Sequence, residues 1–210
     1  MHISEGVLGA PVLAAGAVLS FAGVAIGLKK MDYEKLPEVG VLSSVFFVAS
    51  LIHVPIGISA AHLVLNGICG LLLGWTAFPA ILVGLGLQAI LFQFGGLTTL
   101  GVNTFNMAFP AVLVGYFCGR FIQSPSAVTR GVAEFIAGAG AILGSGILVA
   151  GSLVATGESF YAAAKLIVLV HVPIMVVEGI ITIFVVEFIR RIRPEMLWGR
   201  PLALKPGGQN

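Results

Sequence analysis

The sequence has few charged residues. Only 10% of its 210 residues are Asp, Glu, Lys or Arg, whereas an ordinary soluble domain has roughly 25%. Hydrophobic residues make up 58%, and the mean hydropathy is +1.08. The net charge of +2 is small and the basic residues lie in short clusters between apolar runs, so we expect no nucleic-acid partner. This composition predicts a protein embedded in the lipid bilayer.

Cysteine is scarce, and the common motifs of enzymes are absent. Cys69 and Cys118 lie inside apolar runs without metal-ligand spacing, so we interpret both as small buried hydrophobic residues. No GxxxxGK[ST] phosphate loop is present, which excludes ATP hydrolysis by that route. Ser145 lies between two glycines but has no histidine in its own apolar run. We therefore predict that the chain is not an enzyme.

No basic residue precedes the first apolar run. The first one is Lys29, after that run has ended, whereas a secretory signal peptide begins with a positively charged region. We therefore expect the N-terminal residues to remain on the chain.

Six apolar runs are long enough, or nearly so, to cross a bilayer core of roughly 30 Å, which needs about 20 helical residues. They are residues 7–28, 39–55, 77–94, 103–121, 128–156 and 162–189. A seventh run, 62–75, would reach only about 21 Å as a helix. It is either a short span set deep in the protein or a re-entrant segment.

The basic residues favour seven segments, because Lys and Arg prefer cytoplasmic loops. With seven segments and the N-terminus outside, only Lys165 falls on the outer side. The inner residues are Lys29, Lys30, Lys35, Arg120, Arg130, Arg190, Arg191, Arg193, Arg200 and Lys205. We predict an all-α transmembrane helix bundle with seven membrane segments, one of them short, an outer N-terminus, a cytoplasmic C-terminus and a single domain over residues 1–210.

The N-terminus can chelate a metal ion. The amine of Met1 and the amide nitrogen of His2 would close a five-membered ring on one ion, and that amide nitrogen with Nδ1 of His2 would close a six-membered ring. Three nitrogens in a plane favour Ni(II) or Cu(II) over Zn(II), with Co(II) just below nickel in affinity. The alternative is that Met-His is an accident of the start codon.

The segment 53–67 supplies a candidate fourth ligand. Pro55 and Gly57 interrupt the second run, and Ser59 is a plausible helix N-cap. This predicts His62 in the first turn of the short segment, with Asn66 one turn later to orient it. His53 is expected to be an interfacial residue instead.

Two further stretches place polar residues at the outer face or inside a span. The loop 95–107, GGLTTLGVNTFNM, is irregular, and we expect Thr98, Thr99 and Asn103 to line or cover the metal site. An ordinary connection between helices is the alternative. In the last run, His171 and Glu178 share a helical face and are candidates for intramembrane support of the site, although neighbouring helices could simply satisfy Glu178.

These motifs resemble a known family. MHISEG at 1–6, the His62 region, GGLTTLGVNTFNM at 95–107 and HVPIMVVEG at 171–179 are similar to the membrane-embedded M subunits, NikM and CbiM, of energy-coupling-factor importers for nickel and cobalt. The resemblance implies a multi-pass protein of a prokaryotic cell membrane that captures metal through Met1, His2 and His62. The metal is a transported substrate, and no cofactor is expected.

The resemblance also implies partners, namely a transmembrane coupling subunit, two cytoplasmic ATPases of the ABC type and, in many systems, a small accessory membrane subunit. The sequence AAHLVLNG around His62 departs from the histidine-proline-threonine-glycine of cobalt-type members and favours nickel. A Co(II) capture subunit and a stand-alone ion-coupled metal carrier remain alternatives.

Overall fold

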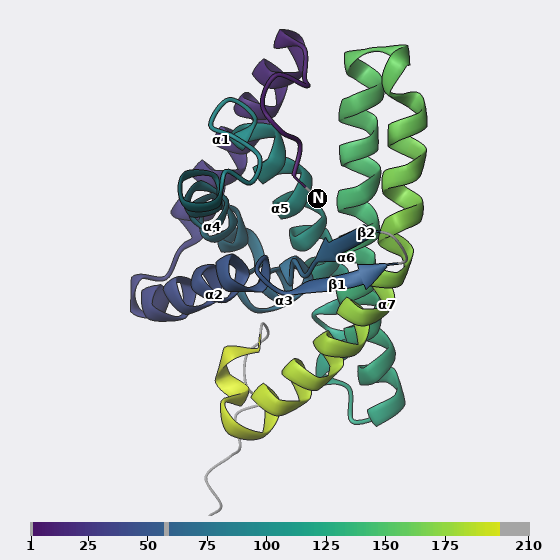
Figure 1. The fold of residues 1–210 in the computed structure, drawn as a ribbon. Helices are drawn as coiled ribbons and strands as arrows, with labels where there is room; N and C mark the ends of the chain where they lie inside the picture. Colours follow the sequence, from purple (N-terminus) through teal and green to yellow (C-terminus); the bar gives the residue numbers. More distant parts are fainter. Residues whose placement is uncertain (1, 57–58, 198–210) are drawn as a thin grey trace, which may run out of the picture.

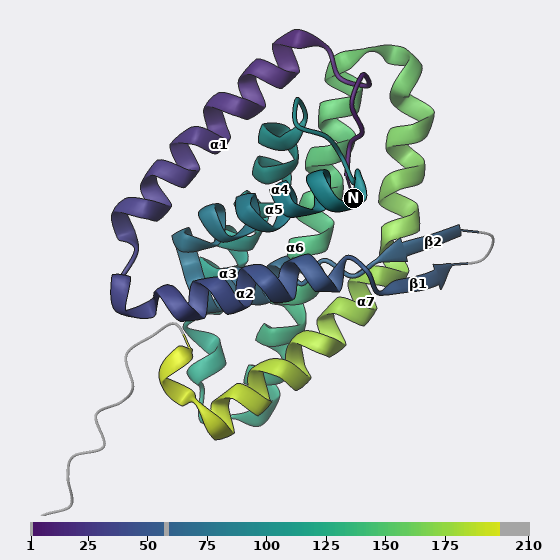
Figure 2. The same cartoon turned by 60° about the vertical axis from the view of Figure 1, so that its left-hand side comes forward.

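The computed structural model describes residues 2–56 and 59–197, and the side chains of 54–56 and 59–61 are outside this description. The described residues form seven α-helices and one two-stranded hairpin (Figures 1 and 2). The helices are α1 Ala10–Lys30, α2 Leu36–Ala49, α3 Asn66–Leu73, α4 Ala77–Phe92, α5 Leu100–Cys118, α6 Ala127–Thr156 and α7 Tyr161–Ile192. The strands are β1 His53–Ile56 and β2 Ser59–His62.

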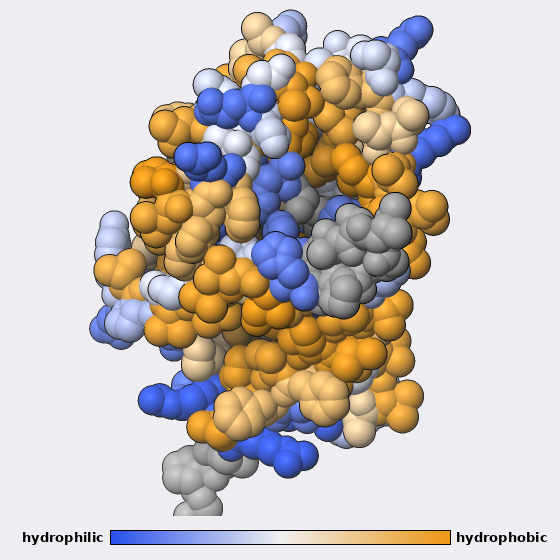
Figure 3. All heavy atoms as spheres, viewed as in Figure 1, coloured by the Kyte–Doolittle hydropathy of each residue, from blue (hydrophilic) through white to orange (hydrophobic). Residues whose placement is uncertain are grey.

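Five helical stretches among the described residues are long and apolar enough to cross a membrane. They are Ala10–Lys30, Asn66–Phe92, Leu100–Cys118, Ala127–Thr156 and Glu158–Ile192. The stretch Asn66–Phe92 consists of α3 and α4 joined by a 3-10 turn. Helix α2 has only 14 residues and is not one of the five. Much of the outer surface is hydrophobic, as the orange spheres of Figure 3 show. These features support a multi-pass membrane protein.

The short run is a central helix. Residues Asn66–Leu72 of α3 are all buried, and α3 packs against α5 with little space between the backbones. A Cβ atom at Gly70 would overlap the carbonyl of Ala111, and one at Gly115 would overlap the carbonyl of Gly70. Glycine lets helix backbones approach closely. Gly70 and Gly115 therefore allow α3 to pack directly against α5, deep in the bundle. Cys69 and Cys118 are buried, as predicted.

The all-α prediction is wrong for the segment that precedes α3. His53–Ile56 and Ser59–His62 pair as antiparallel strands, with His53 opposite His62. Proline at position 55 disfavours helical backbone at the residue before it, and Val54 and Ile56 are β-branched residues that favour strands. Ser59 is therefore not a helix N-cap, and His62 lies at the end of β2 rather than in the first turn of a helix.

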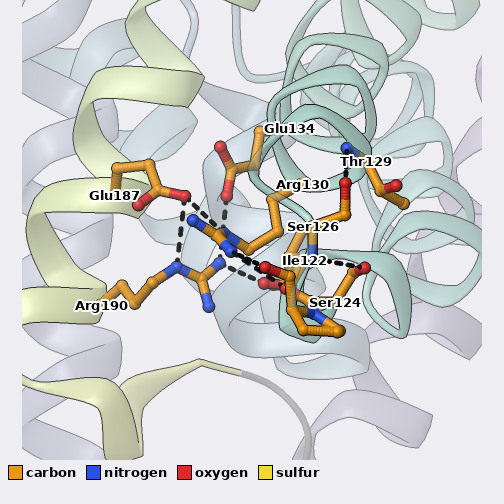
Figure 4. A network of polar contacts seen from close by, with 9 residues as sticks. Ile122, Ser124, Ser126, Thr129, Arg130, Glu134, Glu187 and Arg190 are labelled. Carbon is orange, nitrogen blue, oxygen red and sulfur yellow. Dashed lines mark hydrogen bonds and ion pairs between the residues drawn. The ribbon is translucent and has the colours of Figure 1, made fainter.

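Ion pairs connect α6 and α7 near the end of α7 (Figure 4). Arg190 donates to the fully buried carboxylate of Glu134 at 3.2 Å and also to the carbonyl of Ile122. Glu187 accepts from Arg190 at 3.3 Å and from Arg130 at 2.8 Å. We call these four charged residues the arginine cluster. It anchors the end of α7 to the start of α6.

Candidate metal site

The segment before α1 turns back into the bundle (Figures 1 and 2). Asn103 of α5 holds it by two hydrogen bonds to the main chain of Ile3. The Ile3 N–H donates to Oδ1 of Asn103 at 3.0 Å, and Nδ2 of Asn103 donates to the Ile3 carbonyl at 3.0 Å. Both residues are buried. This pairing fixes the backbone next to His2.

The loop between α4 and α5 packs against the same segment. The carboxylate of Glu5 accepts the backbone N–H of Thr98 at 3.0 Å, and the Thr99 hydroxyl accepts from Nδ2 of Asn103 at 3.2 Å. A Cβ atom at Gly96 would overlap the Glu5 side chain. The two chain segments can pass this closely because glycine has no Cβ. Thr98 contributes its backbone N–H to these contacts, whereas Thr99 and Asn103 contribute side-chain atoms.

The fold brings His2 and His62 into direct contact, although they are 60 residues apart. Nδ1 of His2 lies 3.2 Å from Nε2 of His62. The ring of Phe94 lies nearly parallel to the His62 ring, with the centroids 6.3 Å apart, and 5.8 Å from the His2 ring. The two imidazoles therefore face each other beside an aromatic ring.

Hydrogen bonds on the far sides of the rings define which nitrogens carry protons. Nδ1 of His62 lies 2.8 Å from the Leu63 carbonyl, which can only accept, so this Nδ1 is the protonated nitrogen. Nε2 of His2 lies 2.7 Å from Oε1 of Gln88. The Gln88 amide nitrogen donates to the carbonyls of Phe46 and Phe47 at 3.3 and 3.5 Å, so its oxygen must face His2.

In the neutral rings, therefore, Nδ1 of His2 and Nε2 of His62 both present lone pairs, and these are the two nitrogens that face each other. Burial lowers the pKa of His2 to about 4 and that of His62 to about 3. Both rings are neutral at pH 7. Each of these nitrogens can donate a lone pair to a cation, so the arrangement is suited to binding one.

Asn66 does not orient His62. Its amide nitrogen donates to the carbonyl of Met107 at 2.9 Å and to the hydroxyl of Ser145 at 3.0 Å, which ties α3 to α5 and α6. The prediction assumed a helix running from residue 62 to residue 66. Because α3 starts only at Asn66, the two side chains do not share a helical face.

His171 and Glu178 of α7 have separate roles in the structure. Nδ1 of His171 lies 2.7 Å from the carbonyl of Ile167. With His2, His171 lines a cavity of about 330 Å³ between the N-terminal segment, α6 and α7. Glu178 is fully buried and accepts hydrogen bonds from the backbone N–H groups of Val64 and Leu65, which follow His62 closely in the chain.

Sequence reasoning missed Gln88 and Phe94. Gln88 is 1% exposed and lies within the apolar helix α4. A lone polar side chain inside a membrane span normally faces the protein interior and a partner, so its position was a usable indication of a site. Nothing in the pattern around Phe94 distinguishes it from the neighbouring aromatic residues.

The donors at this site are neutral nitrogens. Among residues 2–56 and 59–197, no group of three or more His, Cys, Asp or Glu side chains could hold a metal ion. Side chains alone therefore contribute two imidazoles, and further ligands would have to come from the main chain. Met1, the predicted source of the amine ligand, lies outside the described residues.

Comparison with known proteins decides the family. A sequence model described as the cobalt uptake substrate-specific transmembrane region, CbiM, matches residues 2–196. The chain belongs to the CbiM family. It is thus a substrate-specific membrane component of transition-metal uptake.

Relatives of this CbiM family chain carry names of both metals. It is 42% identical to a putative metal transport protein of Haemophilus influenzae over 94% of this chain and 97% of the relative. It is 33% identical to a putative fused nickel transport protein NikMN of Archaeoglobus fulgidus, covering 94% and 68% of the two chains. It is 31% identical to the cobalt transport protein CbiM of Kyrpidia tusciae, covering 94% and 86%.

The fold also matches a solved structure. A crystal structure described as a truncated transition metal transporter aligns with a TM-score of 0.69 and 25% identity, covering 91% of this chain and 99% of that one. The CbiM family chain therefore shares its helical arrangement with a transition-metal transporter.

Proposed function

We propose that this protein captures Ni(II) at the outer face of a prokaryotic cell membrane for an ATP-driven energy-coupling-factor importer. The observation that supports this most directly is the pair of lone-pair nitrogens on His2 and His62, 3.2 Å apart. Two nitrogens at that separation can both lie about 2.0 Å from one ion, which is a usual metal–imidazole distance.

The amine of Met1 and the amide nitrogen of His2 complete the proposed ligand set. They would join Nδ1 of His2 in two chelate rings, and Nε2 of His62 would supply the fourth nitrogen. The structure supports this set because Gln88 bonds the other nitrogen of His2 and leaves Nδ1, the nitrogen that the chelate needs, without a proton. A planar set of nitrogens favours Ni(II) over Zn(II).

Cobalt is the second candidate substrate. The description of the family model and the Kyrpidia tusciae relative name cobalt, whereas the Archaeoglobus fulgidus relative names nickel. Competition between Ni(II) and Co(II) for the purified protein, measured by calorimetry, separates these substrates. We expect nickel to displace cobalt, and displacement in the opposite direction would assign cobalt.

The proposed topology has seven segments, with the N-terminus outside and the C-terminus cytoplasmic. The short helices α2 and α3 are the two segments that length does not establish as spans. Partners are a transmembrane coupling subunit, two ABC-type ATPases and a small accessory membrane subunit. Vesicles holding the chain alone should take up no nickel under a proton gradient, whereas vesicles with the partners should do so with ATP. Uptake by the chain alone would indicate a carrier.

An N-terminal extension tests the amine ligand. Adding Gly-Ser before Met1 moves the free amine away from His2, so we expect nickel binding to be lost while circular dichroism still reports the helical fold. The matched control adds Gly-Ser after Asn210. Wild-type nickel affinity in the N-terminally extended protein would refute the amine as a ligand. Substitution of His62 by Ala should also abolish binding.

A further inference from the structure

Helix α3 has no N-cap of its own. Leu65 occupies the N-cap position with a left-handed backbone (φ 58°) and makes no side-chain cap hydrogen bond. The first N–H groups of any helix lack partners within that helix, and α3 begins in the buried centre of the protein. The N–H groups of Val64 and Leu65, just before and at the N-cap of α3, need an acceptor from another element, because leaving a buried donor without a hydrogen bond is costly.

Glu178 of α7 supplies an acceptor there. Its Oε1 lies 2.5 Å from the N–H nitrogen of Val64 and 3.1 Å from that of Leu65, and its Oε2 lies 3.0 Å from that of Leu65. The residue is 0% exposed. A carboxylate at a helix N-terminus is also favoured by the helix dipole. One side chain thus holds two consecutive peptide groups by hydrogen bonds.

The backbone of Glu178 is itself held in place. A Cβ atom at Gly138 of α6 would lie 2.6 Å from the Glu178 carbonyl, so α6 and α7 are in close contact at this point. Thr182 donates its hydroxyl to the same carbonyl at 2.7 Å. The position of Glu178 is therefore fixed, and Glu178 can in turn restrain Val64 and Leu65, whose N–H groups it binds.

That chain directly follows His62. The Leu63 carbonyl accepts the ring N–H of His62, and the Leu63 N–H donates to the Ile52 carbonyl at 3.0 Å. The next two N–H groups are those that Glu178 binds. The backbone N–H groups of residues 63–65 are therefore all hydrogen-bonded. These bonds limit movement of the Leu63 carbonyl, which accepts the ring N–H of His62.

We propose that Glu178 is the positioning residue for His62. By holding Val64 and Leu65 it keeps the Leu63 carbonyl, and through it the His62 ring, where Nε2 faces Nδ1 of His2. This inference rests on the proposed capture of metal by these two histidines. It assigns to α7 a direct influence on metal affinity, without making Glu178 a ligand.

The test substitutes Glu178→Gln, because Gln has nearly the same size but only one acceptor oxygen, and its NH₂ group would face the N–H donors. Glu134→Gln is the matched control, since Glu134 is also 0% exposed and lies in the arginine cluster. We expect Glu178→Gln to weaken nickel binding about 10–100-fold, as is usual when a group supporting a ligand is lost. The absorption band of bound Ni(II) should shift and broaden, because the His62 nitrogen is no longer fixed. Glu134→Gln should retain wild-type affinity and absorption.

Amide hydrogen exchange provides a second readout. A peptide covering residues 63–66 should lose protection in Glu178→Gln and retain it in Glu134→Gln. Wild-type affinity and absorption in Glu178→Gln would overturn the inference, even if thermal stability falls, because a purely structural role predicts lower stability alone. Equal weakening in the Glu134→Gln control would overturn it too.

Two parallel samples separate this inference from the proposed function. If His62→Ala and the N-terminally extended protein lose nickel while Glu178→Gln does not, the capture site stands and the positioning role fails. If none of the three loses nickel, the capture site itself is wrong. Should Glu178→Gln not fold, Glu178→Asp is compared with Glu134→Asp. Weaker binding only in the former supports the inference, and equal binding overturns it.

Discussion

Glu178 and Glu134 are both fully buried carboxylates in one helix bundle, but their partners differ. Glu134 is bound by the guanidinium of Arg190, whereas Glu178 is bound by two backbone N–H groups. Around Glu134 the fold gathers charges of both signs, and around His62 it gathers neutral rings, amides and peptide groups. Both regions contact α7 but at different points, the histidine pair through Glu178 and the arginine cluster through Glu187 and Arg190.

The difference distinguishes a structural anchor from the proposed metal site. In the arginine cluster, each carboxylate already has a cationic partner, so the region has little affinity left for an added cation. At the histidine pair, the described residues supply two ring nitrogens that can each donate a lone pair, which is the chemistry that a cation needs.

Arg190→Leu should disrupt the anchor. It leaves Glu134 buried without its cation, and breaking a buried ion pair in this way costs about 3–5 kcal/mol. We expect a marked drop in the thermal unfolding midpoint in detergent, with nickel affinity per folded molecule unchanged. The double variant Arg190→Leu/Glu134→Leu should recover much of the stability, since no charge is then left unpaired. A loss of nickel affinity without a loss of stability would contradict the division.

Gln88→Leu should weaken the binding site without disturbing the anchor. The Leu side chain cannot accept the Nε2–H of His2, so the proton is free to move to Nδ1 and compete with the metal. We expect nickel affinity to fall about 10–100-fold, which is typical for loss of a group that orients a ligand. Calorimetric titration measures this change.

The matched control for that substitution is Gln93→Asn. Gln93 is exposed at the end of the same helix, and its left-handed backbone (φ 57°) is one that Asn tolerates. Its nickel affinity should equal that of the wild type. Unchanged affinity in Gln88→Leu would show that Gln88 does not set the His2 tautomer.

Acid should destabilise the metal-free protein through the histidine pair. Burial lowers the pKa of His2 to about 4 and that of His62 to about 3, while an unfolded histidine titrates near 6.5. Between these values the unfolded chain binds more protons, so stability is full above about pH 6.5 and is lost as the pH falls toward about 4. The loss should appear as an unfolding midpoint that falls as the pH is lowered from 6.5 to 4.

The double variant His2→Gln/His62→Gln is the control for the effect of acid on stability. It has no imidazole at either site, so its unfolding midpoint should vary less between pH 6.5 and 4. An identical pH dependence in this variant and the wild type would assign the acid effect to other groups.

The sequence predicted the membrane helices well and the connection before α3 poorly. Runs such as 77–94 and 128–156 are apolar over a length that only a helix can satisfy in lipid, and α4 and α6 lie within or close to them. The run from 39 to 55 was predicted to be helical throughout, but helix α2 ends at Ala49. Local backbone preferences around Pro55, together with pairing between strands, determine the hairpin, and hydropathy does not report pairing.

The site was partly accessible from sequence as well. His2 was predicted from the chelate geometry of the N-terminus, His62 from its place after the break at Pro55, and Asn103 from the irregular segment 95–107. The structure places all three around the N-terminal segment. Asn66 was misplaced because the start of α3 was predicted four residues too early. Gln88 was overlooked because it belongs to α4, which no motif connects with the N-terminus.

Composition and residue type are properties of the chain alone, so they suffice to predict a membrane protein and to propose nitrogens of Met1, His2 and His62 as metal ligands. Which ring nitrogens bear protons, and which face each other, follows from the folded structure alone. The proton positions depend on hydrogen bonds that the Gln88 side chain and the Leu63 carbonyl accept. Gln88 belongs to α4, and Glu178, which binds the backbone that follows His62, belongs to α7, so only folding brings them to the two histidines.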